Sequence, residues 1–194
     1  MQSFILAGFG YLLGSIPFGY IISKYKHIDI RKIGSGNIGG TNVSRALGIK
    51  WGLVSGFLDF TKGVIPSLLA VLLIQDPWHR VFVFLMPTIG HIFPVWLGFK
   101  GGKGVSTLMG ALLIIVGWQF LMIWIGVWLV ILKITKIMSL VNIFMVLAIP
   151  VILWLMFDQT AYVFFGVVSI VLIWYAHREN IGRLIKGKEL KLKI

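Results

Sequence analysis

The stretch Ile33–Gly48, IGSGNIGGTNVSRALG, combines glycines and small polar side chains in a way that could bind an anion. Its glycines permit positive φ angles and close backbone approach, and exposed amides in such a loop can form an anion nest. Arg45 adds a forked cation that suits phosphate. Further donors could come from Ser35, Asn37, Thr41, Asn42 and Ser44. We interpret the stretch as an anion-binding loop, and the alternative is a flexible, solvated connector.

The same stretch contains a glycine pattern of dinucleotide-binding proteins. Gly34–Gly39, GSGNIG, matches G-x-G-x-x-G, but no strand–turn–helix unit surrounds it. We therefore reject a dinucleotide site.

A second candidate lies within Gly90–Thr107, GHIFPVWLGFKGGKGVST. Lys103 and the neighbouring glycines Gly101 and Gly102 are predicted to open a helix, where backbone amides and the positive helix end favour phosphate. Ser106 and Thr107 would lie in its first turn. The segment is not a Walker A loop, because Leu97 and Gly104 stand where that motif needs Gly and Ser/Thr. The alternative is an ordinary basic loop on the inner membrane side.

The third candidate is His177–Leu190, HRENIGRLIKGKEL. Helical spacing places His177, Asn180 and Leu184 on one face, with Arg183 beside them. Lysines around it are expected to bind anionic lipid, namely Lys186, Lys188, Lys191 and Lys193. Lipid binding does not account for His177 or Asn180, for which we favour a functional role.

Three ionisable residues are predicted inside apolar spans. Asp59 and Lys62 are three residues apart, so we expect them to neutralise one another. His91, near Pro94, could be functional or could simply bond a neighbouring helix. The part these three play in function stays open.

Apolar segments near the ~20-residue span length recur along the chain. We expect helices at Phe4–Ser23, Trp51–Ile74, Val81–Leu97, Ser139–Leu155 and Thr160–Ala176. Val105–Leu132 could be one long tilted helix, or two short helices folded back at Gly117-Trp118-Gln119.

The distribution of positive charge favours the hairpin. Of the 18 Lys and Arg residues, 16 lie in Lys24–Lys50, Lys100–Lys103, Lys133–Lys136 and Arg178–Lys193. A hairpin places all four segments in the cytoplasm, as the positive-inside rule requires. The prediction is an all-α integral membrane protein of about seven transmembrane helices, with the N-terminus outside and the C-terminus cytoplasmic.

Composition further restricts the class of protein and its partners. The chain has 194 residues, 58% hydrophobic and 12% charged, which indicates a single transmembrane domain over residues 1–194. A net charge of +12 in so apolar a chain favours anionic lipid and anionic substrates, and no nucleic acid. The absence of cysteine excludes a thioester intermediate on the protein.

The six acidic residues form no cluster along the sequence, so we expect no metal site. No histidine has an aspartate five positions later, so the His-x4-Asp acyltransferase pair is absent as well.

The motifs together resemble the bacterial acyl-phosphate-dependent glycerol-3-phosphate acyltransferases, the PlsY family. The resemblance rests on GSGNIGGTNVSRALG, LDFTKG, GHIFPVWLGFKGGKGVST and HRENIGRLIKGKE, and covers nearly the whole chain. It implies transfer of a fatty acyl group from acyl phosphate to the sn-1 hydroxyl of glycerol 3-phosphate, with neither acyl-CoA nor acyl carrier protein as donor and without a cofactor. It also implies a bacterial inner membrane, with the active site at the cytoplasmic face.

On this resemblance we expect Ser35, Asn37, Thr41, Asn42 and Arg45 to hold the acyl-phosphate head. Lys103, His177, Asn180 and Arg183 would grip glycerol 3-phosphate. The full substrate-binding set is Ser35, Gly36, Asn37, Thr41, Asn42, Arg45, Gly101, Gly102, Lys103, Ser106, Thr107, His177, Asn180 and Arg183. Its expected catalytic members are His177, Lys103, Arg45 and Asn180.

The expected mechanism is direct attack of the glycerol 3-phosphate hydroxyl on the acyl-phosphate carbonyl. The proton acceptor could be His177 or a substrate phosphate oxygen. Two other functions are alternatives: an organophosphate transporter of the inner membrane, which should show pseudo-symmetric halves, and a lipid-binding assembly protein, which would need only the basic tail.

Overall fold

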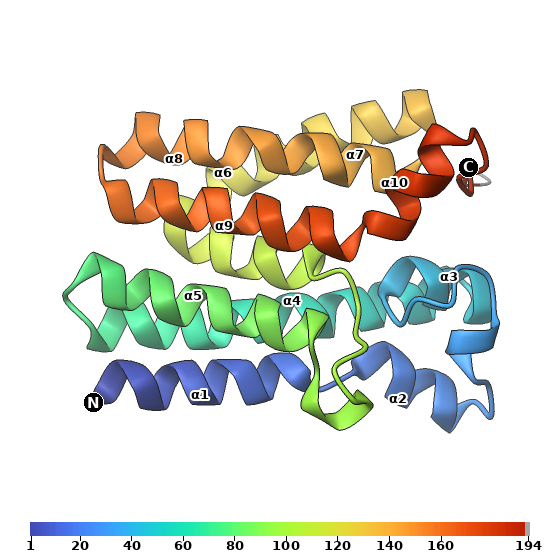
Figure 1. Cartoon of the computed structure of the whole chain (residues 1–194), viewed down its shortest axis with the longest axis horizontal. Coiled ribbons are helices and arrows are strands. Elements are labelled where there is room, and N and C mark those ends of the chain that lie inside the picture. The colour runs from blue at the N-terminus through green and yellow to red at the C-terminus, as the bar shows by residue number, and fades with distance from the viewer. Residues whose placement is uncertain (193–194) are drawn as a thin grey trace. The chain divides into compact units, whose positions relative to one another are not determined.

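A computed structural model describes residues 1–192, whose regular elements are all helices, with no strand among them (Figure 1). The chain forms two compact units, Met1–Ala111 and Leu112–Ile194. Each unit is described by itself below. The predicted all-α class is confirmed.

The first unit contains three long helices, α1, α4 and α5, and several short ones. Its elements are α1 (Gln2–Ser15), α2 (Phe18–Tyr25), η1 (Ile30–Lys32), α3 (Gly40–Leu47), α4 (Ile49–Leu73), α5 (Pro77–Ile92), η2 (Val95–Leu97) and the start of α6 (Val105–Thr135). The first predicted span is broken between α1 and α2. Pro17 causes this break, because proline disfavours helical geometry in the preceding residue, and Ile16 is extended with φ −63° and ψ 116°.

Close helix packing in the first unit depends on glycine. A Cβ on Gly14 would overlap the backbone of Pro87, and one on Gly90 would overlap the carbonyl of Tyr11. Both contacts join α1 to α5. Small residues at such crossings let membrane helices approach closely and gain van der Waals contact.

The second unit contains the rest of α6, followed by α7 (Met138–Met145), η3 (Val146–Ala148), α8 (Ile149–Phe157), α9 (Thr160–Ala176) and α10 (Arg178–Ile185). Gly166 of α9 packs against the backbone of Pro150 in α8, where a Cβ would lie 2.6 Å from Pro150 Cα. The Trp174 indole donates to the carbonyl of Ile143 at 3.1 Å, which ties α9 to α7.

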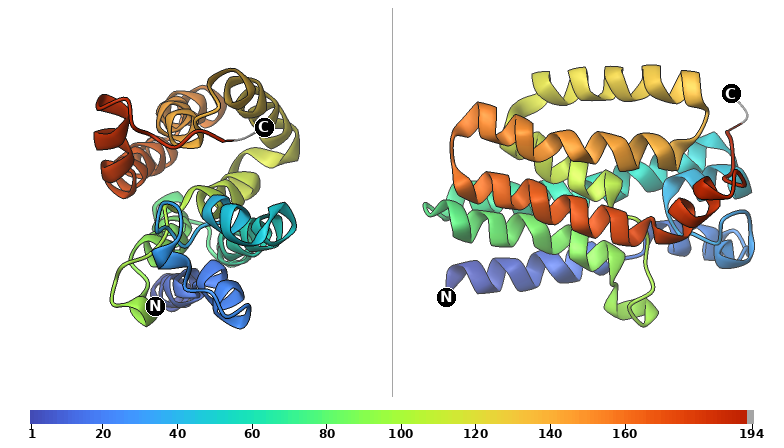
Figure 2. Two further views of the ribbon diagram at one scale, coloured as in Figure 1. Left: turned by 90° about the vertical axis from the view of Figure 1, so that its right-hand side faces the viewer. Right: turned by 45° about the horizontal axis from the view of Figure 1, so that its top comes forward.

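Helix α6 is broken at Gly117, where φ is 82° and ψ is 168°. The ribbon reverses direction there, so that α6 consists of two arms (Figure 2). A side chain would be strained at this positive φ, whereas glycine is not. The break thus falls on the first residue of the predicted turn, Gly117-Trp118-Gln119.

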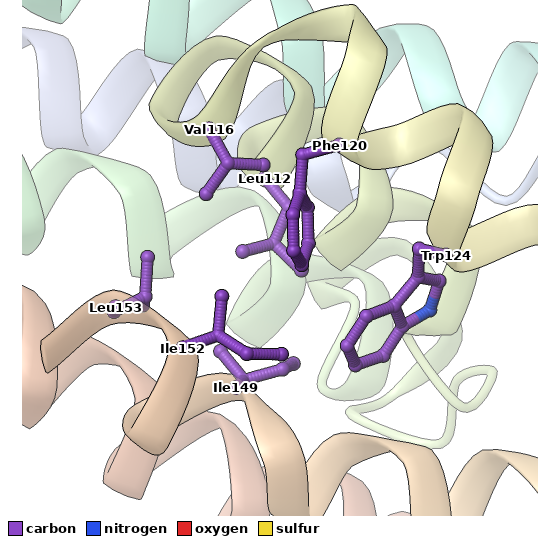
Figure 3. A pocket seen from close by; sticks show the side chains of 7 residues that line it. All are labelled: Leu112, Val116, Phe120, Trp124, Ile149, Ile152 and Leu153. Atoms are coloured by element: carbon purple, nitrogen blue, oxygen red, sulfur yellow. The ribbon is translucent and has the colours of Figure 1, made fainter. Parts of the chain in front are cut away.

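A small apolar recess lies beside the break in α6. Both arms of α6 and α8 line it (Figure 3). The lining residues are Leu112, Val116, Phe120, Trp124, Ile149, Ile152 and Leu153. Every one is apolar, so the recess suits hydrocarbon and offers no group that would hold a phosphate.

Within residues 1–192, five helical segments are long and apolar enough to cross a membrane. They are Gln2–Tyr25, Ile49–Leu73, Pro77–Leu97, Val105–Thr135 and Met138–Phe157. The helices α9 and α10, which are bent by 65° relative to one another, add a sixth if the two together form one span. The expectation of several membrane spans is therefore supported, with α6 counted here as one segment.

Candidate active site

The first candidate stretch is half loop and half helix. Gly34 and Gly36 have φ angles of 58° and 71°, as expected for a glycine loop. From Gly40 to Leu47, however, the chain forms α3, which corrects the expectation of one continuous loop. Arg45 lies in the last turn of this helix and is exposed. Thr41 lies in its first turn and is half-buried.

The side chain of Asn42 organises the loop. Its Nδ2 donates to the carbonyls of Ile30 at 3.2 Å, Ile33 at 2.9 Å and Asn37 at 2.9 Å. Its Oδ1 accepts from the backbone N–H of Ser35 at 3.0 Å. Two N–H bonds already serve three acceptors, so no donor is left for a ligand. This corrects the expectation that Asn42 holds the acyl-phosphate head: the amide shapes the loop that carries Ser35 and Asn37.

The acidic residue that precedes the loop, Asp29, is paired with a neighbouring arginine. The Arg31 guanidinium donates to the Asp29 carboxylate at 2.9 Å through both Nε and Nη2. This hydrogen-bonded contact outweighs the opposing effect of desolvation and lowers the pKa of Asp29 to about 2. Asp29 therefore stays ionised and paired with Arg31 at neutral pH.

An apolar cluster brings the first and second candidate stretches together. Ile30, Ile38 and Val43 are buried beneath the loop, and Leu97 from η2 packs against them. Leu97 belongs to the Gly90–Thr107 stretch, so the two stretches are in contact within the first unit.

Gly101 and Gly102 serve packing in the second stretch. Their backbone amides donate to the carbonyls of Ile92 at 3.1 Å and His91 at 3.0 Å, so these amides are not offered to phosphate. A Cβ on Gly102 would also overlap Nε2 of His91. The expectation that both glycines bind substrate through their amides is corrected accordingly.

The helix predicted after these glycines does begin at Val105. Lys103 and Ser106 are half-buried beside its start. Thr107 is buried, and its hydroxyl donates to the Asp59 carbonyl of α4 at 2.9 Å. That contact gives Thr107 a structural role in place of the expected substrate contact.

Asp59, Lys62 and His91 form one cluster, which we call the buried triad. Lys62 Nζ lies 2.8 Å from Asp59 Oδ1, and their side chains are 1% and 3% exposed. This confirms the predicted pairing of the two charges. His91 Nδ1 lies 3.0 Å from Lys62 Nζ and 3.5 Å from Asp59 Oδ1. Lys62 also donates to the Ile16 carbonyl at 2.8 Å, at the break between α1 and α2.

The third candidate stretch begins at the bend between α9 and α10. His177 is buried there, and its Nδ1 lies 2.8 Å from the Ile173 carbonyl. A carbonyl can only accept, so Nδ1 carries the proton and Nε2 is the basic nitrogen of the neutral ring. Asn180 is buried one turn later in α10, and Arg183 follows after another three residues.

Glu189, which is not among the predicted site residues, joins the third candidate stretch to α7. Its carboxylate accepts from Ser139 at 2.9 Å, from Asn180 and from Arg183 Nε at 2.7 Å. Burial raises the pKa of this carboxyl, but the hydrogen bonds from Arg183, Asn180 and Ser139 outweigh burial and hold the pKa below its usual range. Arg183 is therefore paired with a carboxylate, which weakens its expected role in gripping glycerol 3-phosphate.

One sequence signal could have indicated Glu189. It is an acidic residue in a segment with six basic ones, Arg178–Lys193, so an ion pair within the chain is expected. Ser139 gave no such signal, because a serine at a helix start is common. Within residues 1–192, no three His, Cys, Asp or Glu side chains lie together as a metal site would need.

The structure therefore groups the predicted residues within each unit. Ser35, Asn37, Thr41 and Arg45 share a unit with Lys103, while His177, Asn180 and Arg183 lie in the other. A family model described as glycerol-3-phosphate acyltransferase matches residues 4–187. The chain belongs to the glycerol-3-phosphate acyltransferase family.

Individual members of this family match the chain over its full length. The glycerol-3-phosphate acyltransferase of Aquifex aeolicus is 42% identical over 193 residues, covering 97% of this chain and 98% of that protein. That of Pelagibacter ubique is 42% identical over 198 residues and covers all of both chains.

Two crystal structures of PlsY, an integral membrane glycerol 3-phosphate acyltransferase, match as well. The glycerol 3-phosphate form has a TM-score of 0.94 at 41% identity, covering 99% of this chain and 96% of that one. The lysophosphatidic acid form has a TM-score of 0.92 at 41% identity, with the same coverage. As a member of the glycerol-3-phosphate acyltransferase family, the protein is a multi-pass membrane enzyme of phospholipid synthesis, and the transporter alternative finds no support.

Proposed function

We propose that this acyltransferase moves a fatty acyl group from acyl phosphate to the sn-1 hydroxyl of glycerol 3-phosphate. The products are 1-acyl-glycerol 3-phosphate and inorganic phosphate, and neither acyl-CoA nor acyl carrier protein serves as donor. The observation that carries the proposal is the packing of Leu97, from the stretch that contains Lys103, against the apolar cluster beneath the stretch that contains Arg45. Both substrates carry phosphate, which such cations and hydroxyls recognise.

We assign the phosphate contacts to side chains whose surroundings suit them. Ser35, Asn37, Thr41 and Arg45 hold the acyl-phosphate head, with the backbone at Gly36 allowing close approach. Lys103 and Ser106 bind glycerol 3-phosphate. Gly101, Gly102, Asn42 and Thr107 support these residues through the contacts described above.

In the second unit, His177 and Asn180 act on glycerol 3-phosphate, and the Arg183–Glu189 pair keeps Asn180 in place. His177 Nε2 can accept the hydroxyl proton as the bond to the acyl carbon forms and the phosphate leaves. A phosphate oxygen of a substrate, with a pKa near 6, is the alternative acceptor. No acyl-enzyme is needed, because acyl phosphate already carries a good leaving group and the chain has no cysteine.

The decisive experiment compares donors with purified protein in lipid vesicles. Acyl phosphate with glycerol 3-phosphate should release phosphate and form 1-acyl-glycerol 3-phosphate, whereas acyl-CoA and acyl carrier protein should yield no product. Equal turnover with acyl-CoA would contradict the assignment of the donor. Radiolabelled acyl phosphate given alone should leave no stable label on denatured protein, and a label lost on adding glycerol 3-phosphate would overturn direct attack.

Arg45→Lys is expected to lower turnover about ten- to a hundredfold, the equivalent of about 1.5–3 kcal/mol. An ammonium group keeps the charge but cannot form the bidentate contact that a guanidinium makes with phosphate. The measurement is kcat/KM for acyl phosphate. Arg178→Lys is the matched control, because Arg178 is exposed and its contacts are with Tyr175. Equal kinetics for the two variants would show that Arg45 contributes only its charge.

We also propose that all of residues 1–194 form one domain of about seven transmembrane helices in a bacterial inner membrane. The N-terminus is outside, and the C-terminus and active site face the cytoplasm. This follows from the distribution of basic residues and from counting the two arms of α6 separately. The first arm, Val105–Val116, is about 18 Å long and requires local thinning of the bilayer.

Labelling of single cysteines tests this topology without background, since the chain has no cysteine of its own. Trp118→Cys or Gln119→Cys should react with an impermeant thiol reagent added outside intact cells. Lys136→Cys should react only after the membrane is opened. Labelling of both positions from the same side would contradict the hairpin.

A further inference from the structure

We propose that the buried triad is a positioning device for Lys103. This inference rests on the proposed function in one respect, the binding of glycerol 3-phosphate by Lys103. The triad residues Asp59, Lys62 and His91 touch no substrate in the proposal. They act by holding the chain on both sides of Lys103 against α4 and α5.

The contact before Lys103 is made by His91. The residues directly preceding Lys103, Gly101 and Gly102, lie along the C-terminal end of α5. The Gly102 N–H donates to the carbonyl of His91 at 3.0 Å, and the His91 ring fills the space where a Gly102 side chain would be. His91 therefore contacts this segment with both its backbone and its imidazole.

The contact after Lys103 is made by Asp59. Thr107, four residues further on, donates to the backbone carbonyl of Asp59 at 2.9 Å. Gly63, one turn along α4, is in close contact with the carbonyl of the same threonine. The segment that carries Lys103 is thus fixed at both ends by residues of the triad or directly beside them.

The triad is itself held rigidly. Lys62 Nζ is held by Asp59 Oδ1 and the Ile16 carbonyl, each at 2.8 Å, and contacts His91 Nδ1 at 3.0 Å. The three side chains are between 1% and 6% exposed. Buried polar groups with specific partners resist displacement, because moving one leaves the others unsatisfied. The position of the His91 ring is therefore set by α4 and by the α1–α2 break.

The expected consequence is on substrate affinity. A cation displaced by about 1 Å loses about 10- to 100-fold in binding or rate. Because Lys103 would bind the phosphate equally in ground and transition states, the effect should fall on KM and leave kcat within a few-fold.

His91→Leu, which keeps bulk but loses the contact to Lys62, tests the inference. We expect KM for glycerol 3-phosphate to rise about 10-fold or more, at unchanged KM for acyl phosphate. His91→Asn should restore most of the affinity, since an amide oxygen near the position of Nδ1 can accept from Lys62. In a Lys103→Ala background, His91→Leu should add little further loss, because its effect acts through Lys103.

Ser67→Ala is the matched control, as it removes a buried hydroxyl of α4 that has no hydrogen-bond partner among residues 1–192. Its kinetics should equal those of the wild type. A loss on His91→Leu that is the same with and without Lys103, or that falls on kcat alone, would overturn the inference. Titration of each variant with glycerol 3-phosphate in the absence of acyl phosphate makes the same comparison through the binding affinity. Failure of wild-type turnover with acyl phosphate would instead count against the proposed function.

Discussion

Glu189→Gln is expected to lower the free energy of unfolding by about 3 kcal/mol, the lower end of the range for breaking a buried ion pair. The Glu189 side chain is 6% exposed and binds Ser139, Asn180 and Arg183. A glutamine keeps the shape but presents an amide N–H to one of these donors. The effect lies at the low end because Arg183 is 31% exposed and water can solvate it partly. Denaturation in mixed detergent micelles measures the difference.

The pH dependence of this difference has a defined sign. The pKa of Glu189 is lowered in the folded protein, so its ionised form contributes stability above the ordinary glutamate value of 4.5. That contribution is lost as the pH falls from 4.5 through the lowered pKa. Wild type and Glu189→Gln should therefore differ most at neutral pH and converge in acid.

Glu179→Gln serves as the control for Glu189, since both acids face the same arginine. Glu179 is 73% exposed and lies 3.9 Å from Arg183 Nη1. Exposed pairs of this kind contribute about 0–1 kcal/mol. Equal destabilisation by the two variants would show that Glu189 is no more than a surface charge.

Lys62→Met is expected to have the largest effect on stability, about 3–5 kcal/mol, because it leaves the buried Asp59 carboxylate without its cation. The double variant Asp59→Leu/Lys62→Met should recover most of this loss, since replacing both charges by apolar groups removes the unpaired one. The measurement is a double-mutant cycle of unfolding free energies.

Additive losses in this cycle would contradict direct pairing of the two charges. Should the single variant fail to accumulate, recovery of folded protein in the double variant would still report the coupling. The double variant also separates stability from function. It is expected to be folded yet to bind glycerol 3-phosphate weakly, because His91 has lost its support.

Hydropathy and charge predicted the helices well because both follow from the membrane itself. The apolar spans needed no knowledge of neighbours, and the basic segments indicated the fold-back in α6 at Gly117. The break at Ile16–Pro17 was missed, although Pro17 was a local signal for it. A span that is apolar throughout conceals such a break, because hydropathy does not depend on backbone geometry.

The candidate site was harder to predict because a glycine can be required for either of two reasons, a positive φ angle or close packing. The sequence alone does not distinguish these two reasons. Gly34 and Gly36 are required by positive φ, as expected. Gly102, by contrast, lies in the loop before α6 and is required by the ring of His91, which comes from α5. The role of Asn42 depends in the same way on carbonyl groups up to 12 residues away, which only the folded chain brings within reach.

The hydrogen bonds of Asn42 have a consequence for the energetics of substrate capture. All four groups that it binds belong to the chain itself, so the loop from Ile30 to Asn37 is ordered during folding. The conformational entropy of ordering is then already lost before a phosphate arrives, which leaves more of the interaction energy for affinity. Association should accordingly proceed without a slow closing step, and its heat capacity change should be that of a small contact surface.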